Sequence, residues 1–240
     1  MRNYLAVLGD VYHNGRVRMG GATGRLPTIS AFQRHLQFDL SVGFPILKLD
    51  HTDFDKSLES FLLHYTNDVG NDDFWKTISE IKDHPEAPHT IKCVDLTDAP
   101  SMQVYPWRLL LHERMTLHFK KTFLQEEFIS APDEKIKALS ERLDLGGVPR
   151  YRLDTSLYHA TSDLYRETPN NIIRGALLST YCAHKLGMLP GHYTHLMGEV
   201  YVQNQDLKAI KEILPLDPPI LPTLLVEEWT PEGVTLLGFE

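Results

Sequence analysis

The sequence predicts a single α+β domain, and three observations lead to that prediction. Residues 28–40 and 193–202 show the patterns of extended strands. Residues 3–15, 54–67 and 172–186 carry apolar residues at three- and four-residue intervals, which is typical of amphipathic helices. The two kinds of segment are interleaved along 240 residues, a length that suits one domain with a substantial core.

The composition narrows the class of protein. Hydrophobic residues make up 42% of the chain and charged residues 23%, which is ordinary for a soluble globular protein. The formal net charge of −8 argues against a general nucleic-acid-binding surface. No apolar run approaches the roughly 18 residues of a membrane span, and no signal-peptide pattern is visible. Cys93 and Cys182 are too few and too distant for a disulfide framework or a zinc site, so we expect a soluble cytoplasmic protein without a metal.

The first half of the chain alternates between helical and extended patterns. The expected elements are a helix at 3–15, a strand at 28–40, a turn at 41–45, a short buried strand at 46–49, and helices at 54–67 and 76–83.

A glycine-rich loop lies between Asn14 and Pro27. Its glycines at 20, 21 and 24 and its arginines at 16, 18 and 25 are able to wrap a phosphate, through backbone N–H groups and a guanidinium. A surface loop with ordinary charges is the alternative, and glycine-rich composition alone does not decide between the two.

The second half contains the longest regular pattern. Residues 172–186 predict a helix that ends at Gly187, between a polar loop at 160–171 and a turn at Pro190-Gly191. The other expected elements are a hairpin at 108–124 that turns near His112–Arg114, a helix at 132–143, the strand at 193–202, and a strand, turn and strand from Pro222 to Glu240.

One set of residues within 157–206 matches the pattern of a known family. Its members are Tyr158, Asp163, Pro169, Asn171, Ala176-Leu177-Leu178, Ala183-His184, Gly187, Pro190-Gly191, His195 and Gly198. With these residues the stretch resembles the C-terminal half of the thymidylate synthase and pyrimidine-nucleotide hydroxymethylase superfamily, and Phe38–Ser41 and Gly43–Pro45 extend the resemblance to about two thirds of the chain. The resemblance implies a single thymidylate-synthase-like domain over residues 1–240, with an insertion at about 125–154, a mixed sheet packed by helices, and a homodimer formed through the sheet.

The resemblance also shows where this chain departs from the family's chemistry. Trp107 occupies the position of the cysteine nucleophile, and an indole cannot add to a pyrimidine ring. Its bulk is expected to fill the pocket. Ser57 occupies the position of the glutamate that acts as general base, and a serine hydroxyl cannot do that work near pH 7. We therefore expect no thymidylate synthase activity by the family's covalent route.

Several binding positions remain polar. Asp163 matches a residue that contacts the pterin ring of folate, and Asn171 matches the residue that reads the uracil edge, which an amide can do because it both donates and accepts. Tyr201 and Gln203 stand where the family binds the ribose hydroxyl. Arg25, or alternatively Arg18, stands for a phosphate-binding arginine. The alternative interpretation is that Asp163 and Asn171 only satisfy backbone groups of a loop.

Two hypotheses for function remain open. The first is a divergent enzyme, a transferase acting on a pyrimidine nucleotide, nucleoside or related base-like ligand without a cysteine nucleophile. The resemblance allows a reduced folate, methylene-tetrahydrofolate, as its cofactor. The second is a non-catalytic homologue that serves as a structural or regulatory partner. An open pocket around Asp163 and Asn171 would favour the enzyme, whereas Trp107 packed into that pocket would favour the second hypothesis.

Overall fold

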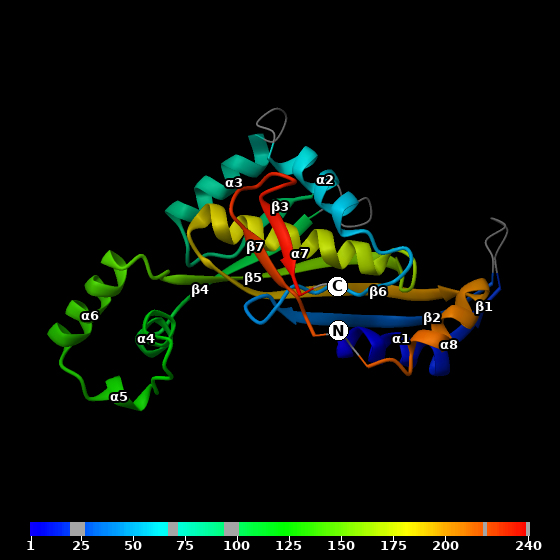
Figure 1. The fold of residues 1–240 in the computed structure, drawn as a ribbon, viewed down its shortest axis with the longest axis horizontal. Coiled ribbons are helices and arrows are strands. Elements are labelled where there is room, and N and C mark those ends of the chain that lie inside the picture. The colour runs from blue at the N-terminus through cyan, green and yellow to red at the C-terminus, as the bar shows by residue number, and fades with distance from the viewer. Residues whose placement is uncertain (20–26, 67–71, 94–100, 218–219, 239–240) are drawn as a thin grey trace.

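The computed structural model describes residues 1–19, 27–66, 72–93, 101–217 and 220–238. Its centre is a six-stranded sheet with the strand order β1-β2-β6-β5-β4-β3 (Figure 1). β5 and β6 are parallel and the other neighbouring pairs are antiparallel, so the predicted α+β class and the mixed sheet are confirmed. The strands are β1 (Arg16–Arg18), β2 (Thr28–Asp39), β3 (His89–Lys92), β4 (Ser101–Arg108), β5 (Tyr151–Asp163) and β6 (Leu189–Gln203).

Helix α7 (Thr168–Leu186) connects the two parallel strands β5 and β6. Pro169 lies in its first turn, where the missing N–H has no intrahelical partner to lose. Gly187 ends the helix with a φ of +64°, a conformation that glycine adopts without strain. Gly175 lies where α7 crosses the sheet, and a Cβ there would come within 2.2 Å of the Tyr193 hydroxyl. The missing side chain therefore sets how closely α7 packs on β6.

The remaining helices complete the core. α2 (Phe54–Tyr65) and α3 (Asp72–Asp83) pack on α7, and the rings of Phe61, Tyr65, Phe74 and Tyr181 meet between them. α1 (Arg2–Asn14) packs against β2, β6 and α8 (Leu207–Ile213). β7 (Thr223–Val226) and β8 (Val234–Leu237) form a separate two-stranded sheet, as predicted for the C-terminal segment. No described helix has the combination of length and apolar composition that crossing a membrane requires.

Residues 46–49 are not the predicted short strand. Ile46 and Leu47 are buried, but the segment has no strand partner in the described part of the chain. Just before it, the Phe44 N–H donates to the Pro222 carbonyl at 2.7 Å. The apolar run correctly predicted that the segment is buried. Because it forms no hydrogen-bonded pair with a strand in the described residues, its backbone is irregular.

Two turns predicted around α7 are also wrong. The stretch 160–171 is not a loop, because β5 continues to Asp163, which pairs with Tyr201 of β6. α7 already begins at Thr168, so only residues 164–167 connect the strand and the helix. Pro190-Gly191 is not a turn either, because it lies inside β6 and the chain reverses at Gly187 instead.

Residues 109–150 form a helical arm at the end of the β4–β5 pair, in place of the hairpin predicted at 108–124 (Figure 1). A long-range contact decides its structure. The Arg114 side chain is only 6% exposed and its guanidinium donates to the Asp144 carboxylate and to the carbonyls of Val148 and Pro149. The helices of the arm are α4 (Leu111–Phe119), α5 (Glu126–Ile129) and α6 (Asp133–Leu145), and α6 confirms the helix predicted at 132–143.

One face of the sheet carries exposed aromatic and aliphatic side chains. Thr155 contacts α7 through Ser179, so by alternation along the strands Tyr105, Trp107, Tyr158 and Leu196 point to the other face. These four side chains are between 36% and 55% exposed. We call this surface the open face. Four of the five strand pairs in this sheet are antiparallel, and antiparallel sheets commonly leave one face to solvent.

Candidate functional site

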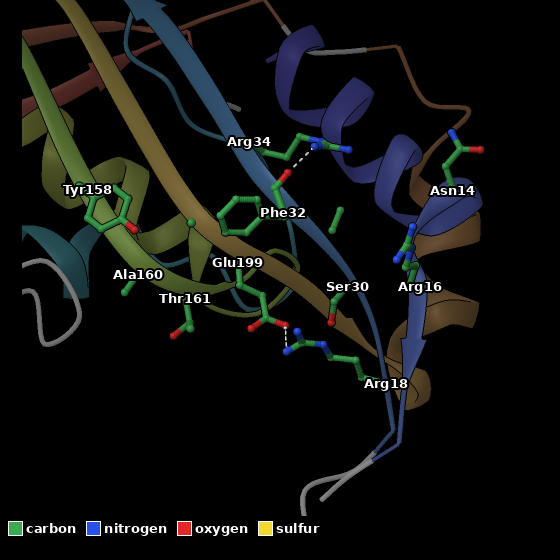
Figure 2. A pocket seen from close by; sticks show the side chains of 12 residues that line it. Asn14, Arg16, Arg18, Ser30, Phe32, Arg34, Tyr158, Ala160, Thr161 and Glu199 are labelled. Atoms are coloured by element: carbon green, nitrogen blue, oxygen red, sulfur yellow. Dashed lines mark hydrogen bonds and ion pairs between the residues drawn. The ribbon is translucent and has the colours of Figure 1, made fainter.

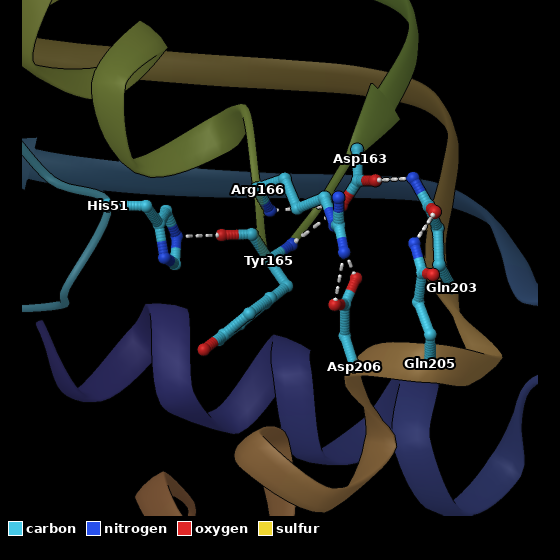
Figure 3. Close-up of polar contacts among 7 residues, drawn as sticks. All are labelled: His51, Asp163, Tyr165, Arg166, Gln203, Gln205 and Asp206. Atoms are coloured by element: carbon cyan, nitrogen blue, oxygen red, sulfur yellow. Dashed lines mark hydrogen bonds and ion pairs between the residues drawn. The ribbon is translucent and has the colours of Figure 1, made fainter.

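The ends of β5 and β6 are joined by hydrogen bonds that involve two predicted binding residues (Figure 3). Asp163 is 1% exposed, and its Oδ1 accepts the backbone N–H groups of Tyr165 at 3.2 Å and Arg166 at 3.0 Å. Its Oδ2 accepts the side-chain amide of Gln203 at 2.8 Å. With three internal donors and almost complete burial, the Asp163 carboxylate shapes the turn into α7 rather than facing a ligand.

The connection between β5 and α7, residues 164–167, is held by hydrogen bonds on two sides (Figure 3). The Arg166 guanidinium makes two hydrogen bonds of 2.7 Å to the Asp206 carboxylate, and this pairing raises the pKa of Arg166. On the other side, His51 Nε2 lies 2.6 Å from the Tyr165 carbonyl oxygen. These contacts link the connection to the end of β6 and to the segment before α2, so the start of α7 is rigidly placed.

The two asparagines at the start of α7 have different surroundings. The Asn170 amide donates to the His51 carbonyl at 3.0 Å and accepts the Asp53 N–H at 3.3 Å, so its role is structural. Asn171 is half-buried, and its side-chain amide has no hydrogen-bond partner among the residues that the structure describes. Of the two, Asn171 keeps both a donor and an acceptor available for a ligand.

The other predicted binding residues lie in different places. Tyr201 is half-buried in β6, in register with Asp163 on one side and Ser30 on the other. Arg25 falls outside the described residues. Arg18, the alternative phosphate-binding residue, is the last residue of β1 and is exposed.

The two positions that replace the family's catalytic groups have non-catalytic surroundings. Ser57 is 2% exposed, and its hydroxyl donates to the Asp53 carbonyl at 2.7 Å, one turn earlier in α2. Trp107 lies on the open face and is 55% exposed. The expectation that its ring fills a pocket is therefore wrong, because strand alternation turns it away from α7.

A cavity of about 660 Å³ lies among β1, β2, β5 and β6 (Figure 2). Strand register assembles it: Glu199 of β6 pairs with Phe32 of β2 and with Thr161 of β5, which brings three distant segments into one row. Ser30 also lines the cavity, so the next row, with Tyr201 and Asp163, adjoins it. Its lining includes Arg16, Arg18, Phe32, Tyr158, Thr161 and Glu199.

Sequence reasoning missed most of this lining. Phe32 and Tyr158 are aromatic residues at solvent-facing positions of strands, 70% and 55% exposed, and that alternation is the signal that could have identified them. Glu199 gave no local signal, because its role depends on the two strands beside it. Asn171 and Asp163 do not belong to the described lining of this cavity.

The charges in the cavity are partly neutralised (Figure 2). Figure 2 shows Arg18 paired with Glu199, at 2.7 Å. Arg34 pairs with Asp10, whose side chain is not drawn in that view, at 2.6 Å. Arg16 has no ion-pair partner among the described residues. The Arg18–Glu199 pair offers adjacent donors and acceptors, and Arg16 offers one free guanidinium, so the lining suits a planar polar ring with a single anionic or acceptor group.

Titratable groups beneath α7 are closed off from solvent. The rings of His159 and His195 lie 4.5 Å apart, and His195 Nδ1 is 2.7 Å from the Tyr193 hydroxyl. Burial, and then the neighbouring His159, lowers the pKa of His195 well below its usual value, so its imidazole is neutral. Burial likewise raises the pKa of the Cys182 thiol. Neither residue is placed to act on a ligand as an acid, base or nucleophile.

The residues present do not fit the folate contact that the resemblance assigns to Asp163. Its carboxylate is bound by Tyr165, Arg166 and Gln203, and is shielded from solvent. The Asp163 carboxylate is therefore not available to contact a folate. In the described ranges of the chain, no group of three or more His, Cys, Asp or Glu side chains is arranged to hold a metal ion.

This mixed sheet packed by helices defines an α+β protein whose architecture is compatible with a thymidylate-synthase-like fold. No protein-family model matches the chain. The chain is 21% identical to the thymidylate synthase of Listeria monocytogenes serovar 1/2a and 22% identical to that of Listeria innocua serovar 6a. Each alignment covers 305 positions, the whole of this chain and 93% of the relative. The similarity points to a thymidylate-synthase-like relationship along the full chain.

Proposed function

We propose that this thymidylate-synthase-like protein binds a pyrimidine nucleotide, nucleoside or related base-like ligand and acts on it as a transferase without a cysteine nucleophile. The cavity among β1, β2, β5 and β6 carries the proposal. It combines the ring faces of Phe32 and Tyr158 with the Arg18–Glu199 pair, which matches the alternating donors and acceptors of a pyrimidine edge.

The charge of the lining favours a ligand with at most one phosphate group. Arg16 is the one arginine of the described lining without an ion pair, and the neighbouring lining residues Ala160 and Thr161 carry no charge. A nucleoside would use the rings and the Arg18–Glu199 pair, and a nucleotide would add a contact to Arg16. Binding of the two should therefore respond differently to loss of Arg16.

A calorimetric panel of uridine, deoxycytidine, dUMP and dCMP tests the proposal. We expect at least one of them to bind saturably and to raise the melting temperature, since a hundredfold excess over the dissociation constant adds about 2.7 kcal/mol of stability. Glu199→Gln, which breaks the Arg18–Glu199 ion pair, should weaken nucleoside and nucleotide binding alike, whereas Arg16→Ala should weaken nucleotide binding only. Arg2→Ala, an exposed arginine on α1 outside the cavity, is the matched control. A panel without any binding would overturn the proposal.

A turnover assay tests separately whether the protein uses the family's covalent route. With dUMP and methylene-tetrahydrofolate we expect no conversion to dTMP, because Trp107 and Ser57 offer neither a thiolate nor a carboxylate. Conversion at ordinary enzyme rates would contradict this expectation.

A non-catalytic homologue that pairs with another protein is the second candidate, and the open face favours it. Tyr105, Trp107 and Tyr158 present aromatic surface there, and the cavity opens beside the same surface through Tyr158. A homodimer formed through this face would serve either function. Native mass spectrometry of the chain alone, and mixed with an active thymidylate synthase, separates a homodimer from a mixed pair.

A further inference from the structure

A second cavity lies at the opposite end of α7 from Asn171. Its volume is about 430 Å³, and it is formed where the last turn of α7 meets α3 and the segment between β7 and β8 (Figure 1). From Asn171 to His184 the helix rises by about 20 Å, so the two regions are separate. We call it the α7 C-terminal pocket. Its lining includes Trp75, Tyr181, Lys185, Glu227, Glu228 and Trp229.

Three aromatic rings form one side of this pocket. Trp229 and Tyr181 meet edge to face with centroids 4.9 Å apart, and Trp75 and Tyr181 do the same at 6.3 Å. The Trp229 Nε1–H donates to His184 Nδ1 at 2.8 Å, which fixes the orientation of the indole. Because an indole N–H can only donate, His184 accepts at Nδ1 and carries its proton on Nε2 in the neutral form.

The chain's own lysine shows that these rings attract a cation. Lys185 Nζ lies 5.2 Å from the centroid of Tyr181 and 5.7 Å from that of Trp75, both within cation–π range. Lys185 is exposed and forms no ion pair with any described residue. Since these cation–π contacts are its only interactions with the described residues, another cation can displace the exposed Lys185 ammonium.

The carboxylates of the pocket lack a matching charge. Glu227 and Glu228 are exposed, line the same cavity, and have no ion-pair partner in the part of the chain that the structure describes. In this lining, two carboxylates stand against the single ammonium of Lys185. Aromatic faces with excess negative charge beside them select cations over anions and neutral rings.

We propose that the α7 C-terminal pocket binds a small organic cation that carries an alkylammonium group. The ammonium takes the place of Lys185 Nζ over Trp75 and Tyr181, with Glu227 and Glu228 beside it, and Trp229 closes the site. Lys185 is then an internal competitor for the ligand. This role gives the proposal an unusual signature, since removing a lining residue strengthens binding.

Tryptophan fluorescence tests the proposal directly. The chain has three tryptophans, so the Trp107→Phe variant leaves only Trp75 and Trp229, both in the pocket, as reporters. Tetramethylammonium chloride is titrated against sodium chloride at constant ionic strength, with sodium benzoate as the anionic probe. We expect a saturable change with tetramethylammonium alone. In the Trp107→Phe background, Lys185→Met should lower the dissociation constant of tetramethylammonium by about two- to fivefold, because the substitution removes one exposed cation–π competitor.

The double variant Glu227→Gln, Glu228→Gln should raise the dissociation constant by a similar factor. Lys82→Met on α3 matches the charge change of Lys185→Met, and Glu232→Gln removes one carboxylate from the β7–β8 connection that carries the two glutamates. Both residues are exposed, and both controls should leave the dissociation constant unchanged. Thermal melts of all variants verify that they are folded. A linear response without saturation, weaker binding in Lys185→Met, or equal effects of the controls would each overturn the proposal, and tighter binding of benzoate would assign the pocket to anions.

Discussion

Gln203 donates its side-chain amide to Asp163 across 2.8 Å, so the last residue of β6 is bonded to the last residue of β5. Both residues were predicted to bind a ligand, and in the structure they bind each other. The bond closes a network that also includes the backbone of the connection into α7. Loss of Asp163 is therefore a change to the fold as well as to a candidate site.

Asp163→Ala should lower the free energy of unfolding by about 2–4 kcal/mol, because the N–H groups of Tyr165 and Arg166 and the Gln203 amide lose a buried acceptor. Asn171→Ala should cost less than about 1 kcal/mol, since its amide has no partner among the described residues. Urea denaturation measures both. Equal stabilities of the two variants would contradict the structural role of Asp163, and only Asn171→Ala is suitable for testing ligand binding without unfolding.

His195 should make stability depend on pH between its folded and unfolded pKa values. The unfolded chain binds a proton at this imidazole near pH 6.5, whereas burial keeps it neutral in the folded chain. The unfolded state therefore binds more protons below pH 6.5, so this contribution is constant above that pH. Below it, the free energy of unfolding decreases by up to about 1.4 kcal/mol per pH unit.

Urea denaturation of His195→Gln from pH 7.5 to 5 checks this prediction, and the variant should show a flatter profile than the original chain. His13→Gln, an exposed histidine on α1, is the control and should keep the original profile. Identical slopes for the original chain and His195→Gln would show that His195 does not titrate differently in the two states.

The open face should mediate self-association. Trp107→Ser combined with Tyr158→Ser removes two exposed rings and should shift a dimer toward monomer, since interface energy is concentrated in a few aromatic residues. Sedimentation equilibrium measures the dissociation constant. Leu145→Ser, 91% exposed on the helical arm, should have no effect. A monomeric original chain at high micromolar concentration would rule out the homodimer.

The helical arm should depend on Arg114. Arg114→Met leaves the carbonyls of Val148 and Pro149 without this donor, while Asp144 keeps its hydrogen bonds from Arg150, so we expect a cost of about 1–3 kcal/mol. We expect hydrogen exchange to accelerate in α4 and α6 while β5, β6 and α7 keep their protection. Arg142→Met, exposed on α6, is the control. Uniform acceleration throughout the chain would show that the arm and the sheet unfold together.

The Asp144 carboxylate, which accepts hydrogen bonds from Arg150 and Arg114, determines how the arm responds to acid. Hydrogen bonds from Arg150 and Arg114 lower the pKa of Asp144 to about 2. An unfolded aspartate titrates near 3.9, so the folded state holds the charged form more strongly and this stabilisation is present above that pH. It is lost as the pH falls toward about 2, and the arm should keep its hydrogen-exchange protection at pH 4.

Local sequence patterns correctly predicted several helices and the fold class. The apolar spacing of residues 172–186 and the Gly187 stop identified most of α7, and the pattern of residues 54–67 identified α2 to within two residues. These predictions succeed because a helix buries one face along its own length, and that periodicity is visible without any partner. The α+β class followed from the same signals.

Only the tertiary structure decided the arm and the candidate sites. Residues 108–124 gave a strand-like pattern, yet a bond from Arg114 to residues thirty or more positions later makes α4 part of a helical unit. Glu199 faces the cavity because β2 and β5 flank β6, and Asp163 is withdrawn from ligands because Gln203 reaches it from another strand. Hydrogen bonds and register between distant segments leave no local periodicity, so the sequence named the candidate residues while the packing of the strands selected those available to a ligand.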